Sequence, residues 1–314
     1  MMRILHMGLL FLGIAPALQA CGPPSVIKFP GVVRHAVLRG DHLLCVNDAE
    51  RLIAVDLKRG RTFDLGASAD KRWYDGDVAD GRALMIEKDR LLVVGLTDGK
   101  PIHAVAIGGE RTWAFGFAGK DRAFVHRGKS LAILELTTGK NLHTIQLGDD
   151  SWPRGAIPWQ KVGNRLFIVG PATTLCVIDL EAGKLCDRIS VEARASIQSL
   201  HVEGTSVFCI GNPFGWGARV DHLVSVDLES KTCRLVDLPR EIRKFGRFAN
   251  GPYGTMYLIE GNRIDRYTMA GSLCSSFKMP GGEAVLAVWQ QHAIIGRVNE
   301  IRLEEIKETP VARR

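Results

Sequence analysis

The sequence lacks the short motifs by which enzymes and metal proteins are often recognised. Its nine histidines include no His-x-x-x-His pair and its seven cysteines no Cys-x-x-Cys pair, so a zinc site has no local support. A nucleophile elbow and a phosphate-binding loop are missing as well. These absences do not exclude catalysis by residues that distant segments bring together. They do leave the sequence without a predicted catalytic residue, metal or cofactor.

The sequence also has little helical periodicity and no block of like charge. Hydrophobic residues make up 46% of the chain, an ordinary value for a globular protein, and the net charge is +7. A mild positive excess suits anionic partners or membrane surfaces. Because lysine and arginine do not cluster in one segment, nucleic acid is not predicted as a partner.

One acidic stretch, residues 75–81, invites comparison with a calcium-binding loop because hard cations prefer clustered carboxylate oxygens. The pattern fails in detail. Ala79 stands at the fifth place, where a ligand is needed, and Ile86 at the twelfth, where a bidentate glutamate is needed. We interpret the stretch as a solvated turn.

What the sequence does contain is a repeat, seen most clearly in residues 174–184. An apolar run ends in Asp-Leu and is followed by a glycine turn and a lysine, and related segments recur along the chain. The equivalent apolar residues are 37 to 48 residues apart, and they are Leu57, Leu96, Leu136, Leu180, Leu228, Met269 and Ile306. Repeats of this length are typical of solenoids, propellers and related arrays.

Each repeat expands into four short segments rich in Val, Ile and Leu and bounded by turn residues, a pattern that indicates β-strands. Seven copies predict an all-β, seven-bladed β-propeller with four-stranded antiparallel blades, spanning residues 21–310 with a short tail at 311–314. The last repeat lacks a fourth strand. Residues 25–31 resemble 275–281, the fourth strand of the sixth repeat, so the N-terminal strand is predicted to complete the last blade. A two-sheet sandwich is the alternative, and blade counts of six or eight stay open.

Residues 1–20 are predicted to be a signal peptide, with Arg3 as the positive start and an apolar stretch too short for a comfortable membrane span. Leu18-Gln19-Ala20-Cys21 resembles the bacterial lipobox, which implies that Cys21 becomes the lipidated first residue of the mature chain. A periplasmic or membrane-anchored lipoprotein is therefore expected. Cleavage after Ala15-Pro16-Ala17 is the alternative, and it would give a secreted protein.

The six other cysteines are predicted to be mostly small buried apolar residues rather than a disulfide framework. Cys186, Cys233 and Cys274 occupy equivalent places in successive repeats, which lie too far apart to be bridged. Cys176 and Cys186 flank one tight turn, but a turn centred on residues 182–183 would pair Cys176 with Ile189.

Two segments carry a family resemblance. Ala54-Val55-Asp56-Leu57-Lys58-Arg59-Gly60 matches the core of the quinoprotein repeat, and residues 135–140 keep its Thr-Gly turn. The chain therefore resembles the pyrroloquinoline-quinone-like and YVTN-like (WD40-like) propeller superfamily, which implies the propeller fold. The tryptophan by which that family docks one blade onto the next is replaced by Asp64, His103, His143 and Asp187. A lipidated propeller also resembles the lipoprotein that scaffolds outer-membrane assembly.

Arginine and tryptophan residues gather in the connections between blades and in one insertion, all of which emerge on one face of a propeller. They are Arg72, Trp73, Arg111, Trp113, Trp152, Arg154, Trp216, Arg219 and Arg247. A surface of this kind suits carboxylates, acidic peptides or anionic sugars, because guanidinium pairs with anions and stacks on aromatic rings. In the alternative interpretation the tryptophans wedge between blades and the arginines are solvated.

Together these features predict an exported, lipid-anchored monomeric ring that acts as a protein-binding scaffold at the bacterial cell envelope. The alternative function is that of an enzyme or a binder of small ligands or carbohydrate, lactonase-like, lyase-like or quinoprotein-like, with its site at the central channel.

Overall fold

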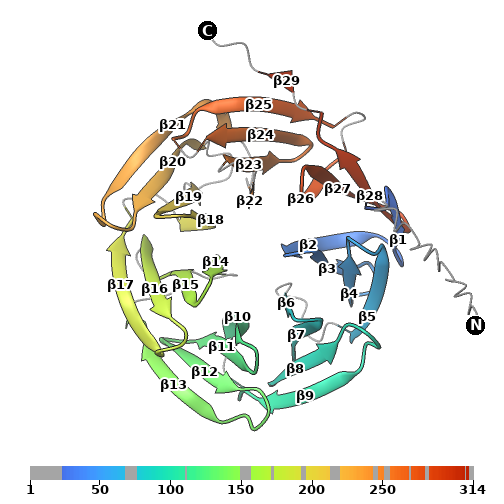
Figure 1. Ribbon diagram of the computed structural model, residues 1–314, viewed down its shortest axis with the longest axis vertical. Helices are drawn as coiled ribbons and strands as arrows, with labels where there is room; N and C mark the ends of the chain where they lie inside the picture. The colour runs from blue at the N-terminus through green and yellow to red at the C-terminus, as the bar shows by residue number, and fades with distance from the viewer. Residues whose placement is uncertain are drawn as a thin grey trace, which may run out of the picture.

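The computed structural model describes residues 23–67, 76–109, 112–148, 157–170, 173–191, 196–212, 220–242, 247–250, 255–268, 270–279, 283–307 and 309–310. The elements in these ranges are β-strands, arranged as seven antiparallel sheets around a common axis (Figure 1). The protein is a seven-bladed β-propeller, as the repeat predicts, so the sandwich is ruled out.

The strands follow the repeat, four to a blade. The first three blades contain β2 (Val33–Arg39), β3 (His42–Asn47), β4 (Arg51–Asp56) and β5 (Arg61–Ala67); β6 (Asp77–Ala79), β7 (Arg82–Glu87), β8 (Arg90–Gly95) and β9 (Pro101–Ala106); and β10 (Thr112–Gly119), β11 (Arg122–Arg127), β12 (Ser130–Glu135) and β13 (Asn141–Gln146). The next two contain β14 (Trp159–Val162), β15 (Arg165–Val169), β16 (Thr174–Asp179) and β17 (Lys184–Ser190); and β18 (Ser196–Glu203), β19 (Ser206–Asn212), β20 (Val220–Asp227) and β21 (Cys233–Ile242).

The last two blades each depart from the simple pattern. Blade 6 contains β22 (Arg247–Asn250), β23 (Thr255–Glu260), β24 (Arg263–Thr268) and β25 (Leu273–Lys278), and β29 (Thr309–Pro310) adds a fifth strand at its outer edge, which the sequence did not predict. Blade 7 contains β26 (Val285–Trp289), β27 (His292–Arg297) and β28 (Glu300–Glu305), and β1 (Val26–Lys28) pairs with β28 as its fourth strand. The predicted closure by the N-terminal strand is confirmed.

The middle strands of each blade are apolar because both faces of the sheet are covered by neighbouring blades. In β4 and β8 five consecutive residues are buried, whereas β17 alternates between exposed and more buried positions. The apolar clusters lie between successive blades: one joins Leu44 and Ala54 to Leu92, and another joins Ile27 and Leu57 to Leu303. The core is therefore a closed series of sheet-on-sheet contacts.

The repeated apolar residue makes the same backbone hydrogen bond in each blade where it is described. The amides of Leu57, Leu136 and Leu180 donate to the carbonyls of Asp41, Asp121 and Asn164, in the turn between the first two strands. Ile306 repeats this bond with Gln291. Ile306 is thus the seventh copy of the repeat, as expected, while Met269 lies outside the described residues.

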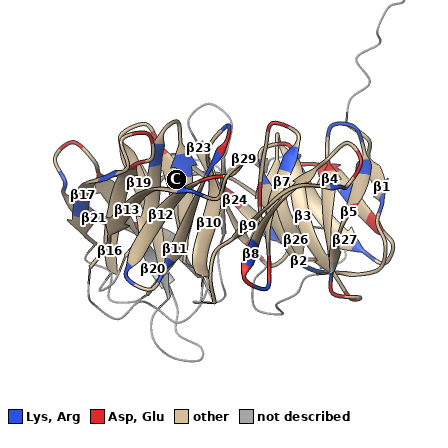
Figure 2. Ribbon diagram, turned by 90° about the horizontal axis from the view of Figure 1, so that it is seen from below, with Lys and Arg blue, Asp and Glu red and all other residues tan. Residues whose placement is uncertain are grey.

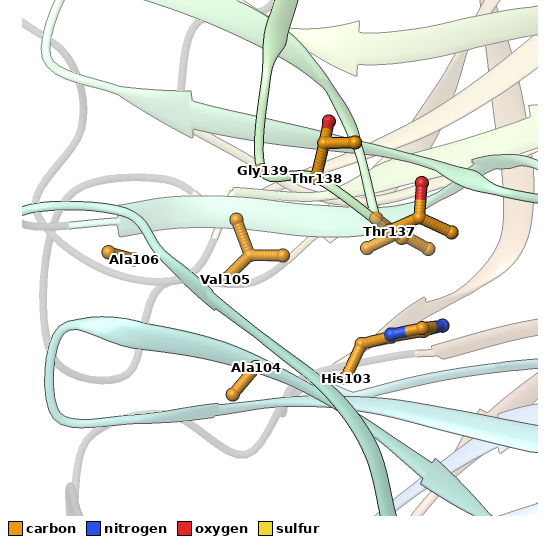
Figure 3. Close-up of a pocket in the computed structure, with 8 residues that line it drawn as sticks. His103, Ala104, Val105, Ala106, Thr137, Thr138 and Gly139 are labelled. Atoms are coloured by element: carbon orange, nitrogen blue, oxygen red, sulfur yellow. The ribbon is translucent and has the colours of Figure 1, made fainter.

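Adjacent blades touch at the positions held by His103, His143 and Asp187. A Cβ atom built on Gly183 would lie 2.1 Å from Cγ of His143 in the preceding blade, so this turn needs glycine. In the next blade Lys231 holds the glycine position with φ +56° and forms an ion pair with Asp187. His103 and Ala104 line a small pocket together with Thr137 and Thr138 of the next blade (Figure 3). The equivalent contact between adjacent blades is thus made by an imidazole packed on a glycine turn in one case and by an ion pair in another.

The cysteines are free thiols wherever they are described. Cys45, Cys176 and Cys209 are buried as predicted, Cys233 and Cys274 are partly buried, and Cys186 is exposed because it lies on the outer strand β17. The predicted register was wrong by one residue: Cys176 pairs with Arg188, since a bulge between Val177 and Ile178 shifts the pairing.

Candidate functional site

Most of the predicted arginine and tryptophan residues lie outside the described residues, together with Cys21. These are Arg72, Trp73, Arg111, Trp152, Arg154, Trp216 and Arg219. Trp113 lies in β10, where it is partly buried and packs against the apolar cluster of blades 3 to 5. Arg247 begins β22, opposite Ile259. The hypothesis of a common arginine and tryptophan surface stays a prediction.

The structure contains a central cavity of about 840 Å³ in the channel where the alternative function would have its site. Its wall is formed by the innermost strands β2, β6, β14, β18, β22 and β26, which surround the axis in Figure 1. Cavities that bind small ligands have volumes of roughly 300 to 1,000 Å³. The pocket beside His103 is smaller, about 230 Å³. The central cavity is therefore the better candidate site.

One side of the cavity carries a cluster of side chains from three blades. The guanidinium carbon of Arg39 lies 4.5 Å from the ring centre of Trp159, and Nε of Arg39 lies 3.8 Å from Oδ1 of Asp77. Nε of Arg39 also donates to the carbonyl of Gly76 at 3.3 Å. A cation over an indole face is attracted by the ring quadrupole. Arg39, Asp77 and Trp159 thereby come together from blades 1, 2 and 4.

Lys161 extends this cluster along β14. Residues two apart on a strand share a face, so Lys161 and Trp159 lie on the same side of the sheet. Nζ of Lys161 donates to the carbonyl of Phe117 at 3.0 Å. A Cβ atom at Gly116 would lie 2.8 Å from Trp159 and 2.9 Å from Oδ2 of Asp77. Glycine in β10 therefore makes room for the indole and the carboxylate.

Asp77 stabilises the cluster from within. Its Oδ1 accepts from the amide of Val78 at 2.9 Å and its Oδ2 from the amide of Phe117 at 2.8 Å. Burial raises the pKa of Asp77 above its usual value, and the charges of Arg39 and Lys161 oppose that shift. The prediction of a solvated turn over residues 75–81 was wrong for Asp77, which is only 9% exposed. Strand β6, Asp77–Ala79, lies in the middle of that stretch and lines the cavity.

The blade that supplies Arg39 also supplies a second acidic residue, Asp41, whose charge is already compensated. Asp41 accepts from the indole of Trp289 at 3.0 Å and forms an ion pair with Lys58 at 2.6 Å. The hydrogen bond from Lys58 is the main reason that the pKa of Asp41 lies below its usual value. Arg39 and Lys161 thus face a cavity in which both lining aspartates have partners.

His201 lines the cavity from β18 and is only 2% exposed. Its Nε2 is buried without a hydrogen-bond partner, as is Nε1 of Trp159. A buried polar atom without a partner costs roughly 1 to 3 kcal/mol. Both nitrogens are buried, so this cost falls on the folded protein, and neither offers an accessible contact in the cavity.

Burial lowers the pKa of His201 from 6.5 to about 4, which predicts acid sensitivity. Below pH 6.5 the unfolded chain takes up the proton first, so stability falls as the pH drops toward 4, by about 3 kcal/mol in all. His201→Leu should abolish this contribution. Urea unfolding from pH 8 to 4 would show the variant losing less stability than the wild type. Parallel curves would contradict the assignment.

The fold and the cavity define the class of this protein as a seven-bladed β-propeller with a cationic and aromatic cluster on its channel wall. Comparison with protein-family models and with curated proteins finds no match to this chain. The function must therefore be argued from the site itself.

The described residues contain no group of three or more His, Cys, Asp or Glu side chains that could hold a metal ion. They also contain no helix that is long and apolar enough to cross a membrane.

Proposed function

We propose that this protein is an exported binding scaffold whose partner presents an anionic group to the central channel. The main support for the proposal is that two basic residues, Arg39 and Lys161, line the central cavity. In the edge-on view of Figure 2 the described basic and acidic residues are interspersed over the ring. The channel cluster is therefore a local positive feature rather than part of a basic face.

The predicted arginine and tryptophan residues around the channel mouth would enlarge this surface. Trp216 and Arg219 belong to the long insertion between β19 and β20, and the same chemistry would let them bind acidic segments. A partner engaged by both the mouth and the channel would be held at several points.

The location that we propose is the cell envelope. It is supported by the signal-like residues 1–20 and by the lipobox-like Leu18-Gln19-Ala20-Cys21. Lipidation of Cys21 would anchor the ring to a membrane, and the resemblance to the quinoprotein-like and YVTN-like superfamily and to the outer-membrane assembly scaffold fits this role.

Binding of a small molecule is the second candidate function. The size of the central cavity favours it. The two candidates share one location and differ in whether the anionic group belongs to a protein partner.

The experiment combines intact mass with crosslinking in the native host. We expect a mature chain that begins at Cys21 and carries acyl mass. A photo-crosslinking residue at Ser199, which lines the cavity, should give a discrete adduct with one envelope protein, and the same residue at Thr144 on the outer strand β13 should not. Arg39→Gln should abolish the Ser199 adduct. Equal labelling from both positions, or an adduct that survives Arg39→Gln, would contradict the proposal.

A further inference from the structure

We infer that the central cavity contains a specific site for a carboxylate carried on an apolar body. This inference deepens the proposed function and rests on it for the location of the site. It specifies the chemical class of the bound group and the side chains that recognise it.

The sign of the ligand follows from the charges on the cavity wall. Both oxygens of Asp77 accept backbone amides, at 2.9 and 2.8 Å, so this carboxylate orients the cluster and is not offered to a ligand. Asp41 is paired with Lys58. Arg39 and Asp77 offset each other's charge, and Lys161 adds a further positive charge nearby. An anion is therefore favoured over a cation.

The donors favour a carboxylate as the anion. An ammonium group has three donors, and the carbonyl of Phe117 takes one donor of Lys161, which leaves two for a ligand. Arg39 lines the same cavity and adds guanidinium donors, which pair with carboxylates. Two oxygens on one carbon can accept from the ammonium group and from a neighbouring donor together.

The remaining wall requires an apolar body. Leu38, Leu286 and Phe248 line the cavity together with Val288 and Trp289. Burial of apolar ligand surface against such a wall contributes about 25 cal/mol per Å². A fully hydrated anion such as inorganic phosphate would leave this surface uncovered. The arrangement thus fits an amphipathic carboxylate, either a free small molecule or the C-terminal carboxylate of a partner chain that ends in an apolar residue.

Calorimetric titration of the purified full chain tests the site with two matched pairs of probes. The first pair is 4-phenylbutyrate and its neutral amide, and the second is acetyl-Ala-Ala-Phe with a free carboxylate and its C-terminal amide. We expect a carboxylate to bind at least about tenfold more tightly than its amide, with a change in tryptophan fluorescence. Tighter binding of the peptide acid would indicate a partner's C-terminus, and binding of phenylbutyrate alone a free small molecule.

Substitutions of Arg39 and Lys161 test whether the carboxylate binds to these two side chains. Arg39→Gln and Lys161→Gln should each weaken carboxylate binding by about tenfold or more, which corresponds to about 1.4 kcal/mol. Arg90→Gln is the matched control because Arg90 is exposed, pairs with Glu87 and does not line the cavity. Thermal unfolding would verify that the variants are folded. If Arg39→Gln does not fold, Lys161→Gln still tests the site.

Equal affinity for acid and amide, or binding that both channel variants leave unchanged, would overturn the inference. That failure is distinguishable from failure of the proposed function. If the wild-type protein gave no Ser199 adduct in cells but bound carboxylates in calorimetry, the protein partner alone would be rejected. A persistent adduct without carboxylate binding would reject the carboxylate site alone.

Discussion

Gly183→Ala is expected to destabilise the propeller by about 3 kcal/mol or more, because one added methyl group meets two obstacles. The new Cβ atom would lie 2.1 Å from Cγ of His143 in the preceding blade, far inside van der Waals contact. The backbone at Gly183 also has φ +62°, which L-residues with a side chain rarely adopt. Neither the turn at Gly183 nor the imidazole of His143 can move aside without disturbing the contact between blades 3 and 4.

Gly163→Ala separates the two effects. Gly163 has φ +58° but nothing within 4 Å of an added Cβ atom, so its cost should be only about 1 kcal/mol. In urea unfolding, Gly183→Ala should therefore lose clearly more stability than Gly163→Ala. Combining Gly183→Ala with His143→Ala should restore part of the loss, since the clash disappears. Equal losses for the two glycine variants would show that the blade contact contributes nothing.

The fold could be predicted from the sequence because its determinants are periodic. Leu57, Leu136, Leu180 and Ile306 recur at similar intervals since each makes the same backbone bond at the same level of a blade. Ring closure was predictable for the same reason: Val26–Lys28 resembles the fourth strand of another blade because it fills the same place. Identical packing environments select similar residues, and similarity of this kind is visible in a single sequence.

The candidate site is not periodic, and this is why the sequence did not reveal it. Arg39, Asp77 and Lys161 belong to the first strands of three different blades, and successive members are 38 and 84 residues apart in the sequence. No spacing rule connects them, because only closure of the ring brings those strands to one axis. The available signal was weaker: polar residues in first strands, which line the channel of any propeller. The arginine and tryptophan residues predicted to form a site belong mostly to the connections between strands and not to these first strands.

The local register shows a second limit of sequence reasoning. The pairing of Cys176 with Ile189 assumed a regular hairpin, whereas the bulge between Val177 and Ile178 moves the partner to Arg188. Similar irregularities occur between Leu52 and Ile53 and between Ile133 and Leu134 in other blades. A bulge inserts one residue without changing the apolar pattern much, so the strand is predictable and its exact partner is not.

Ile27→Asp is expected to have the largest effect on stability, at least about 4 kcal/mol, because it places a carboxylate inside the contact that closes the ring. Ile27 is 1% exposed and belongs to the apolar cluster that joins blades 7 and 1, with Leu57 and Leu303. Its strand β1 is held to β28 by only three residue pairs. Loss of β1 would leave the edge of β28 unpaired, and an unpaired edge promotes association between molecules.

Val26→Asp is the matched control, because Val26 is the preceding residue on the same strand but is 45% exposed. The alternation of faces along a strand places its side chain toward solvent. Urea unfolding should give a change below about 0.5 kcal/mol for Val26→Asp. Ile27→Ala should lower the free energy of unfolding by about 2 to 5 kcal/mol. This variant tests the prediction if Ile27→Asp does not fold. Size-exclusion chromatography should show association for Ile27→Asp only. If Ile27→Ala and Val26→Asp were equally stable, the N-terminal strand would not be the element that holds the ring closed, and blade 7 would have to be stable with three strands.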